Sequence, residues 1–386
     1  IVSNPDSRIF HGCPIANLRA LPGVGDDDED AAALGEIIPG LPEEVALQCI
    51  ARVSRAHHPK LSLVSSPWRS LLRSPLLFST RARLLASEFS LCLSLRLHAI
   101  RSSLWYTLDG GASPPRLRAL PPLPSPAAFT IGSAAVALGP KIYLLGGSVG
   151  HVPSPNVWIY DAVTNRWEAG RRMRVGREFC AVGAAAGKIY VIGGCVVNCL
   201  ARSVNWAEVF DPGPGTWAAV PSPSEAREKW MQGSAVVEGR VYVMGERGGA
   251  VLDPREGAWE GLPAELEMGW RGGAAAVGGV LYCYDFMGRI RGYLPAEGRW
   301  EVVQGLEGLP RFLCGAAMAG IGGRLAVVWQ GKAEAGRRAT GVADILCAEI
   351  QVGDSGGELW GSVVWSGAVH SAPADSAIVH CSAVEL

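Results

Sequence analysis

The sequence predicts a small all-α module of three helices followed by an all-β propeller of six blades. Two observations lead to this fold class. Near the N-terminus, a segment of about forty residues repeats apolar side chains at helical spacing after a proline and two glutamates. The remainder consists of short β-branched and aromatic stretches, separated by glycine and proline, that recur at intervals of about 40 to 50 residues.

Composition supports this organisation and excludes several classes of protein. The chain has 386 residues, enough for more than one domain, with 49 glycines, 26 prolines and only 18% charged residues. Such usage favours tight turns over long solvated helices. The formal net charge of −1 argues against nucleic acid or an anionic membrane as an obligatory partner. No apolar run is long enough to predict a membrane span.

The ten cysteines are spread along the chain without a dense cluster or a CxxC pair. This spacing is not typical of a disulfide framework or a zinc site. We therefore expect reduced, mostly buried thiols in a cytoplasmic and/or nuclear protein, and no metal site.

Residues 1–35 lack hydrophobic periodicity and include the acidic run Asp26–Asp30. Such a run is typical of a solvated segment, so we expect a disordered acidic tail. The helical module is predicted over residues 36–80. Its first helix begins at Pro42, because proline and the two glutamates after it suit a first helical turn. Three short helices cannot bury all the apolar surface of this segment among themselves, so we expect part of it to meet a partner.

The stretch LPEEVALQCIARV…LSLVSSPWRSLLRSPLLF resembles an F-box, the element that docks a substrate receptor onto Skp1 in cullin-based ubiquitin ligases. Leu-Pro opens the motif and Val-Ser-Ser-x-Trp-Arg closes it, although the family more often has lysine where Pro67 stands. The alternative is a small helical subdomain that uses the same side chains as its own core. The resemblance implies that seven residues face Skp1 or support that face: Leu41, Pro42, Val45, Ile50, Val64, Trp68 and Leu71.

Residues 81–102 are predicted to form a linker or helical connection, and the propeller is predicted over residues 103–386. "GPKIYLLGG" (139–147) returns as "AGKIYVIGG" (186–194) and "EGRVYVMGE" (238–246), and two weaker copies follow. Each of the first four units then continues to a turn and a tryptophan. The repeated residues are Gly146, Gly147, Gly193 and Gly194, then Tyr143, Tyr190, Tyr242 and Tyr282, and finally Trp167, Trp217, Trp259 and Trp300.

Double glycine, tyrosine and a later tryptophan are the hallmarks of kelch repeats, and this region resembles a kelch propeller. The glycines allow a strand end to pass close to neighbouring backbone, and the aromatic rings fill the wedge between sheets. Residues 103–124 resemble the second half of a blade and residues 376–386 its first half, so we expect the two to close the ring. Five full units and this shared blade give six. A count of five or seven stays open, because the last unit (316–375) is long and irregular.

"GGSVG" (146–150) matches the serine-hydrolase pattern G-x-S-x-G, which would make Ser148 a nucleophile. The serine does not recur in the other units, and two prolines follow where the helix of a nucleophile elbow should begin. We therefore predict no catalytic residue, and no cofactor or metal ligand.

An arginine precedes the first strand of several units: Arg177, Arg227, Arg271 and Arg311. In kelch proteins, arginines at this place can line the ligand surface, where they would bind the carboxylates of an acidic peptide. The alternative, which we prefer, is that each arginine braces its own or the next blade.

An F-box followed by kelch repeats resembles the F-box/kelch family, which is abundant in plants. The resemblance implies a non-catalytic substrate receptor of a Skp1–cullin–F-box ubiquitin ligase. The helical module would bind a Skp1-like adaptor, and through it the cullin complex, while the propeller would bind an unidentified target protein. Two alternatives stay open: a kelch scaffold that binds Skp1 outside a ligase, and a propeller enzyme with an incidental F-box-like segment.

Overall fold

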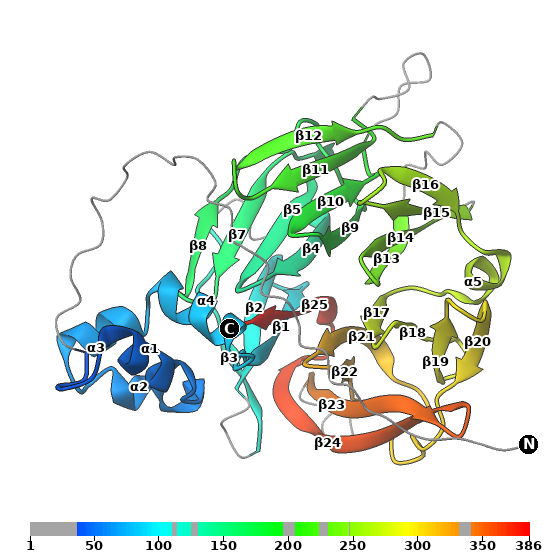
Figure 1. Cartoon of the computed structure of the whole chain (residues 1–386). Helices are drawn as coiled ribbons and strands as arrows, with labels where there is room; N and C mark the ends of the chain where they lie inside the picture. Colours follow the sequence, from blue (N-terminus) through cyan, green and yellow to red (C-terminus); the bar gives the residue numbers. More distant parts are fainter. Residues whose placement is uncertain are drawn as a thin grey trace, which may run out of the picture.

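The computed structural model describes residues 37–109, 114–124, 130–195, 205–223, 231–246, 248–331 and 341–386. Within these residues, a helical module is joined to a closed ring of six β-sheets (Figure 1). The predicted fold class is confirmed, including the count of six blades.

The helical module begins with α1 (Glu43–Ala51), which starts directly after Pro42. The two glutamates in its first turn complement the positive end of the helix dipole. A 3₁₀-helix, η1 (Arg55–His57), and a single turn, α2 (His58–Leu61), follow. The module is therefore built from short pieces that depend on packing for their stability.

The third predicted helix is two helices in the structure, α3 (Ser66–Leu71) and α4 (Pro75–Arg83). Pro75 has no amide hydrogen, and the Ser74 hydroxyl accepts a hydrogen bond from the amide of Leu76 (3.1 Å), so a new helix begins here. Both helices contribute to one apolar core, whose buried members are Ile37, Ala46, Leu47, Ile50, Ala51, Leu71, Leu72 and Leu77.

The propeller is built from antiparallel sheets of four strands, one of which carries an additional short strand, β6. From the inner to the outer strand, the first sheet is β25 (Ala377–Glu385), β1 (Phe89–Leu97), β2 (Ser102–Asp109) and β3 (Arg116–Ala119), and the second is β4 (Ile131–Leu138), β5 (Lys141–Val149), β7 (Val157–Asp161) and β8 (Arg166–Ala169), with β6 (Val152–Pro153) beside β5. The third sheet is β9 (Ala181–Ala185), β10 (Lys188–Ile192), β11 (Ala207–Asp211) and β12 (Thr216–Val220), and the fourth is β13 (Met231–Val237), β14 (Arg240–Gly245), β15 (Gly248–Asp253) and β16 (Ala258–Gly261). The fifth sheet is β17 (Ala274–Val277), β18 (Val280–Tyr284), β19 (Ile290–Leu294) and β20 (Arg299–Val302), and the sixth is β21 (Cys314–Ile321), β22 (Arg324–Gln330), β23 (Val342–Ser355) and β24 (Glu358–Pro373). One further helix, α5 (Ala264–Gly269), lies in the connection from β16 to β17.

Because neighbouring strands run antiparallel, the connections of every sheet divide between two ends of the ring. We call the near end the one where β25 ends and β1 begins, since the helical module joins the propeller there. The far end carries the connections from the second to the third strand of each sheet and those from one sheet to the next. Apolar cores fill the spaces between adjacent sheets.

The ring closes in a sheet that both ends of the propeller share, as the sequence predicts. The number of strands that each end contributes differs from the prediction. Strand β25 is the inner strand and pairs with β1, so the N-terminal side supplies three strands of this sheet rather than two. Residues 81–102 are thus not a linker, because β1 occupies much of them. Leu91, Leu93 and Leu95 of β1 are fully buried in the core of the propeller.

The repeated aromatic residues lie where the sheets meet. The four tyrosines are buried, and each of the four tryptophans donates its indole hydrogen to the connection that enters its own blade. The pairs are Trp167 with the carbonyl of Pro121 (3.0 Å), Trp217 with Arg171 (2.9 Å), Trp259 with Pro221 (2.7 Å) and Trp300 with Glu265 (2.9 Å). Each ring therefore fixes an outer strand to the chain arriving from the preceding blade.

The double glycine of the first unit meets the chain that leads into the second. Gly146 has φ of +63°, and a Cβ there would overlap the carbonyl oxygen of Arg177. The amide of Gly147 donates a hydrogen bond to that same oxygen (2.8 Å). Glycine is needed at this point because of both the backbone angle and the close approach.

Candidate protein-binding surfaces

The seven apolar residues predicted for the helical module divide between its core and its surface. Ile50 and Leu71 are buried in the core of the module, where they can only support an outer face. Leu41 and Pro42 are exposed, and the side chains of Val45 and Val64 are 44% and 61% exposed. Apolar side chains left in water on a small module of this kind mark a surface that can bind another protein.

Trp68 connects the two segments that carry this surface, the one around Leu41 and the one around Val64. Its indole nitrogen donates to the carbonyl of Ile37 (2.5 Å), which holds the start of α3 against the segment that precedes α1. Ser65 caps α3 by accepting a hydrogen bond from the amide of Trp68 (3.3 Å), so Pro67 is accommodated in the first turn. Leu63, which the sequence analysis did not single out, is 78% exposed beside Val64. The feature of the sequence that could have identified Leu63 is the short apolar run that contains both residues.

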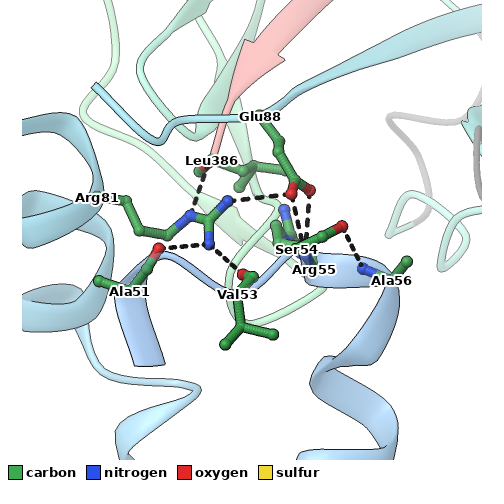
Figure 2. Close-up of polar contacts among 8 residues, drawn as sticks. All are labelled: Ala51, Val53, Ser54, Arg55, Ala56, Arg81, Glu88 and Leu386. Atoms are coloured by element: carbon green, nitrogen blue, oxygen red, sulfur yellow. Dashed lines mark hydrogen bonds and ion pairs between the residues drawn. The ribbon is translucent and has the colours of Figure 1, made fainter. Parts of the chain in front are cut away.

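A buried arginine fixes the module to the propeller (Figure 2). Arg81 of α4 is fully buried, and one guanidinium nitrogen donates to the carbonyls of Ala51 (2.9 Å), the last residue of α1, and Val53 (2.7 Å), just beyond it. Its Nε donates to the carbonyl of Leu386 (3.4 Å), and its other terminal nitrogen lies 3.3 Å from a carboxylate oxygen of Glu88. One side chain thus holds two segments of the helical module and the last strand of the propeller together.

Glu88 completes this junction. Its carboxylate accepts from the backbone amide of Arg55 (3.1 Å), and its own amide and carbonyl pair with the carbonyl and amide of Leu386 (2.7 and 2.8 Å). The helical module is therefore held against the propeller by a network of charged hydrogen bonds, in addition to the chain that runs from α4 to β1.

The structure corrects the predicted ligand-facing role of Arg177. Its side chain is fully buried, and it pairs with the fully buried Glu208 (2.6 Å). The guanidinium also donates to the carbonyls of Gly193 and Trp206 (2.5 and 2.9 Å), while its backbone contacts the preceding blade through Gly147. Arg177 accordingly braces the first and second units against each other, which is the alternative that the sequence analysis preferred.

The other three arginines differ from Arg177. Arg271 and Arg311 are exposed at the far end of the ring, and Arg227 lies outside the described residues. Arg271 donates to the carbonyl of the neighbouring Trp270 (2.8 Å). The Arg311 guanidinium lies 5.6 Å from the ring centroid of Phe312, so its charge faces outward beside an aromatic surface.

Exposed apolar side chains gather around Arg311. Phe286, with 79% of its side chain exposed, and Met287 lie in the connection from β18 to β19, and Phe312 precedes β21. A Cβ at Gly288 would lie 3.2 Å from the Phe312 ring, so these two far-end connections touch. We call Phe286, Met287, Arg311 and Phe312 the far-end patch. Sequence reasoning missed the three apolar members, because single exposed side chains in irregular connections have no periodic signal.

Hydrogen bonds made by Tyr284 and Asp285 fix the two connections that form the far-end patch. Tyr284 donates its hydroxyl hydrogen to the carbonyl of Arg311 (3.2 Å) and accepts from the amide of Leu313 (2.8 Å). Asp285 accepts from the amides of Met287 and Arg289 (both 2.9 Å) and thereby shapes the turn that presents Phe286. The patch is therefore a fixed surface rather than a loose loop.

The structure provides no support for chemistry at Ser148. This serine lies within β5, and its hydroxyl donates to the carbonyl of Ile131 (3.4 Å). Across the residues that the structure describes, no cluster of three or more His, Cys, Asp or Glu side chains could hold a metal ion. In the same residues, no helix has both the length and the apolar character to cross a membrane.

A six-bladed propeller joined to a small helical module defines a protein of the F-box and kelch class. Family models agree with this description. The model described as "FKB95, Kelch-repeats domain" matches residues 105–370, and the F-box domain model matches residues 38–80. The chain belongs to the F-box/kelch-repeat family.

Two curated relatives from Arabidopsis thaliana are similar to this chain over most of its length. F-box/kelch-repeat protein At4g39550 is 35% identical over 369 residues, which covers 89% of this chain and 92% of the relative. F-box/kelch-repeat protein At4g39240 is 32% identical over 352 residues, with 89% and 90% covered. Similarity therefore extends across both the helical module and the propeller.

Proposed function

We propose that the protein is the substrate-recognition adaptor of a Skp1–cullin–F-box ubiquitin ligase. The helical module binds a Skp1-like adaptor, and the propeller binds a target protein for ubiquitination. The observation that carries this proposal is the exposed apolar surface of the module, formed by Leu41, Val45, Leu63 and Val64, in a chain whose family is defined by an F-box.

The rigid junction suits this role. An adaptor of this type carries out no bond chemistry and accelerates transfer by raising the concentration of the target near the enzyme that carries ubiquitin. A flexible attachment would spread the target over a larger volume. The buried Arg81 network fixes the propeller relative to the helical module and therefore fixes the position of a bound target.

We place the target on the far-end patch. The apolar side chains of Phe286, Met287 and Phe312 are of the kind that dominates protein interfaces, and the Arg311 guanidinium beside them can pair with a carboxylate of the target. The patch lies at the end of the ring opposite the helical module, so a target bound there leaves the Skp1-binding surface free.

The Skp1-binding surface is tested by capture of a Skp1-like adaptor with the purified chain. Val64→Glu and Val45→Glu place a charge on the proposed contact surface, and we expect each to weaken capture at least tenfold because an unpaired charge would be buried. Leu85→Glu is the matched control: this leucine is 94% exposed just after α4 and should tolerate the charge. Equal capture by Val64→Glu and Leu85→Glu would contradict the assignment of this surface. Substitution of Leu71 is unsuitable, because this residue belongs to the core.

The far-end patch is tested in a Val64→Glu background, in which the target should be bound but not degraded. Affinity capture from plant cells is compared with the same chain carrying Phe312→Ser. A protein that is captured by the first chain and lost from the second identifies the target. Ile100→Ser, an exposed far-end residue on another blade, serves as the control and should retain the target. Retention of every captured protein by the Phe312→Ser chain would refute the placement.

A further inference from the structure

A cavity of about 1090 Å³ lies between the helical module and the near end of the propeller. On one side, its wall is formed by η1, α2, the C-terminal end of α3 and α4. On the other side, it is formed by the near ends of β1, β2, β3, β7 and β25. The volume is sufficient for a ligand the size of a metabolite.

The charges that line this cavity are strongly unbalanced. Four arginines line it against a single acidic side chain, that of Glu88, whose oxygens are already engaged by Arg81 and by the amide of Arg55. In the described parts of the chain, none of the lining arginines has a carboxylate partner within ion-pair distance. The lining arginines are Arg55, Arg69, Arg73 and Arg118.

The excess of positive charge affects the pKa of Arg55. Its guanidinium packs 5.6 Å from the ring centroid of Phe78. Burial lowers the pKa of Arg55, and although Glu88 raises it, the positive charges of Arg81 and Arg118 lower it further. Arg55 is half-buried, and a cation in such a position with like charges around it is stabilised by a bound anion.

The neutral polar groups of the cavity also lack some of their partners. His58 lines the cavity, and its buried Nε2 has no hydrogen-bond partner within the described chain. Burial and then the charge of Arg81 lower the pKa of His58 to about 4, so the ring is neutral at pH 7. The Ser90 and Thr107 hydroxyls bond to each other (2.6 Å) and the Tyr160 hydroxyl donates to Asn165 (2.9 Å), so the oxygens of this wall can still accept hydrogen bonds. Such a wall can bind the hydroxyl or bridging oxygens of a ligand.

We propose that this cavity binds a small phosphorylated metabolite with two or more phosphate groups, which bridges the helical module and the propeller. Guanidinium groups bind phosphate oxygens in bidentate pairs, and the lining arginines come from both parts of the molecule. Arg55, Arg69 and Arg73 belong to the helical module, whereas Arg118 belongs to β3 of the propeller. A ligand that contacts both sets adds to the junction that Arg81 makes.

The proposal is tested by calorimetric titration of the whole chain with two probes, inositol hexakisphosphate and inorganic pyrophosphate, and with uncharged myo-inositol as a control. We expect saturable binding of at least one phosphate probe at one site per chain, and none of myo-inositol. Arg118→Gln should weaken binding about tenfold or more, since it removes a charged hydrogen-bond donor. Arg116→Gln, an exposed change on the same strand outside the cavity lining, should leave binding unchanged.

A second measurement separates loss of the site from loss of the fold. The thermal midpoint of the Arg118→Gln chain without ligand should equal that of the wild type, while the upward shift caused by the phosphate probe should be lost. Absence of saturable binding of both probes, or equal binding by the Arg118→Gln and Arg116→Gln chains, would overturn the proposal. So would binding that appears only after Asp26–Asp30 are replaced by asparagine, because the acidic run of the chain would then be the occupant.

Discussion

Replacement of Arg81 by methionine should release the helical module from the propeller. The change leaves the carbonyls of Ala51 and Val53 without their charged donor, and each such hydrogen bond contributes about 1.5 to 3 kcal/mol. The pair with Glu88 contributes less, because that carboxylate is partly exposed to water. Allowing for the desolvation that a buried guanidinium no longer requires, we expect a net loss of about 3 kcal/mol.

This loss should be local, because the hydrogen bonds and ion pairs of Arg81 to the described part of the propeller end at two residues, Glu88 and Leu386. About 3 kcal/mol corresponds to roughly a hundredfold increase in the population of the undocked module. Native-state hydrogen exchange measures this population: protection of the amides of α1 and α4 should fall roughly a hundredfold, while the propeller strands keep theirs. Arg83→Met on the same helix is the control, since Arg83 is exposed and its hydrogen bond goes to Thr80 of its own helix. A change of less than threefold in α1 and α4, or an equal loss throughout the propeller, would refute this account of the junction.

Three further predictions concern the propeller. Arg177→Met should lower the free energy of unfolding by about 3 to 5 kcal/mol in urea titrations, and adding Glu208→Leu should recover much of it; a loss below 1 kcal/mol would contradict the bracing role. Gly146→Ala should lower the thermal midpoint more than Gly187→Ala, because both glycines have positive φ but only Gly146 faces neighbouring backbone; equal losses would show that the close approach is unimportant. Burial lowers the pKa of His380 to about 4, so below pH 6.5 the unfolded chain binds a proton that the folded chain refuses. Stability should therefore fall between pH 6.5 and 4, by about 2 kcal/mol at pH 5, and His380→Gln should remove this part; the same acid loss in both proteins would contradict it.

The fold could be predicted because its signals are local and repeated. A positive φ that favours glycine, a tyrosine on the second strand and a tryptophan that meets the preceding connection recur in the first four units, so the pattern shows the blade without its neighbours. The strand β1 was missed for the opposite reason. It occurs once, outside the repeats, and its sheet is completed by β25 from the other end of the chain.

The candidate sites were only partly predictable, because they depend on contacts distant in sequence. Arg81 meets the carbonyl of Leu386 across 305 residues, and nothing around Arg81 distinguishes it from the exposed Arg83. Arg177 and Arg311 occupy similar positions before a first strand, yet the first is buried because Glu208 on β11 pairs with it, while the second lies over Phe312. The sequence shows which residues recur, but it does not show which of them pairs with a side chain from another strand in the folded chain.

The exposed face of the helices raises the same difficulty. Ile50 and Val45 share the helix α1 and a similar chemistry, but packing against α3 and α4 buries one and leaves the other in water. Helical periodicity predicts an apolar stripe and cannot divide it between a core and a docking surface. The structure supplies this division, since it shows which apolar residues of the F-box form the core and which are exposed.

The central claim, that this chain links a target to a cullin ligase, is tested most directly by assembly from purified parts. The full chain, a Skp1-like adaptor and a cullin are mixed and separated by size-exclusion chromatography with mass determination. We predict a single complex that contains all three proteins and that is lost with Val64→Glu but not with Leu85→Glu. A complex with the Skp1-like adaptor that excludes the cullin would indicate a scaffold outside the ligase, and the absence of any complex would contradict the proposed function.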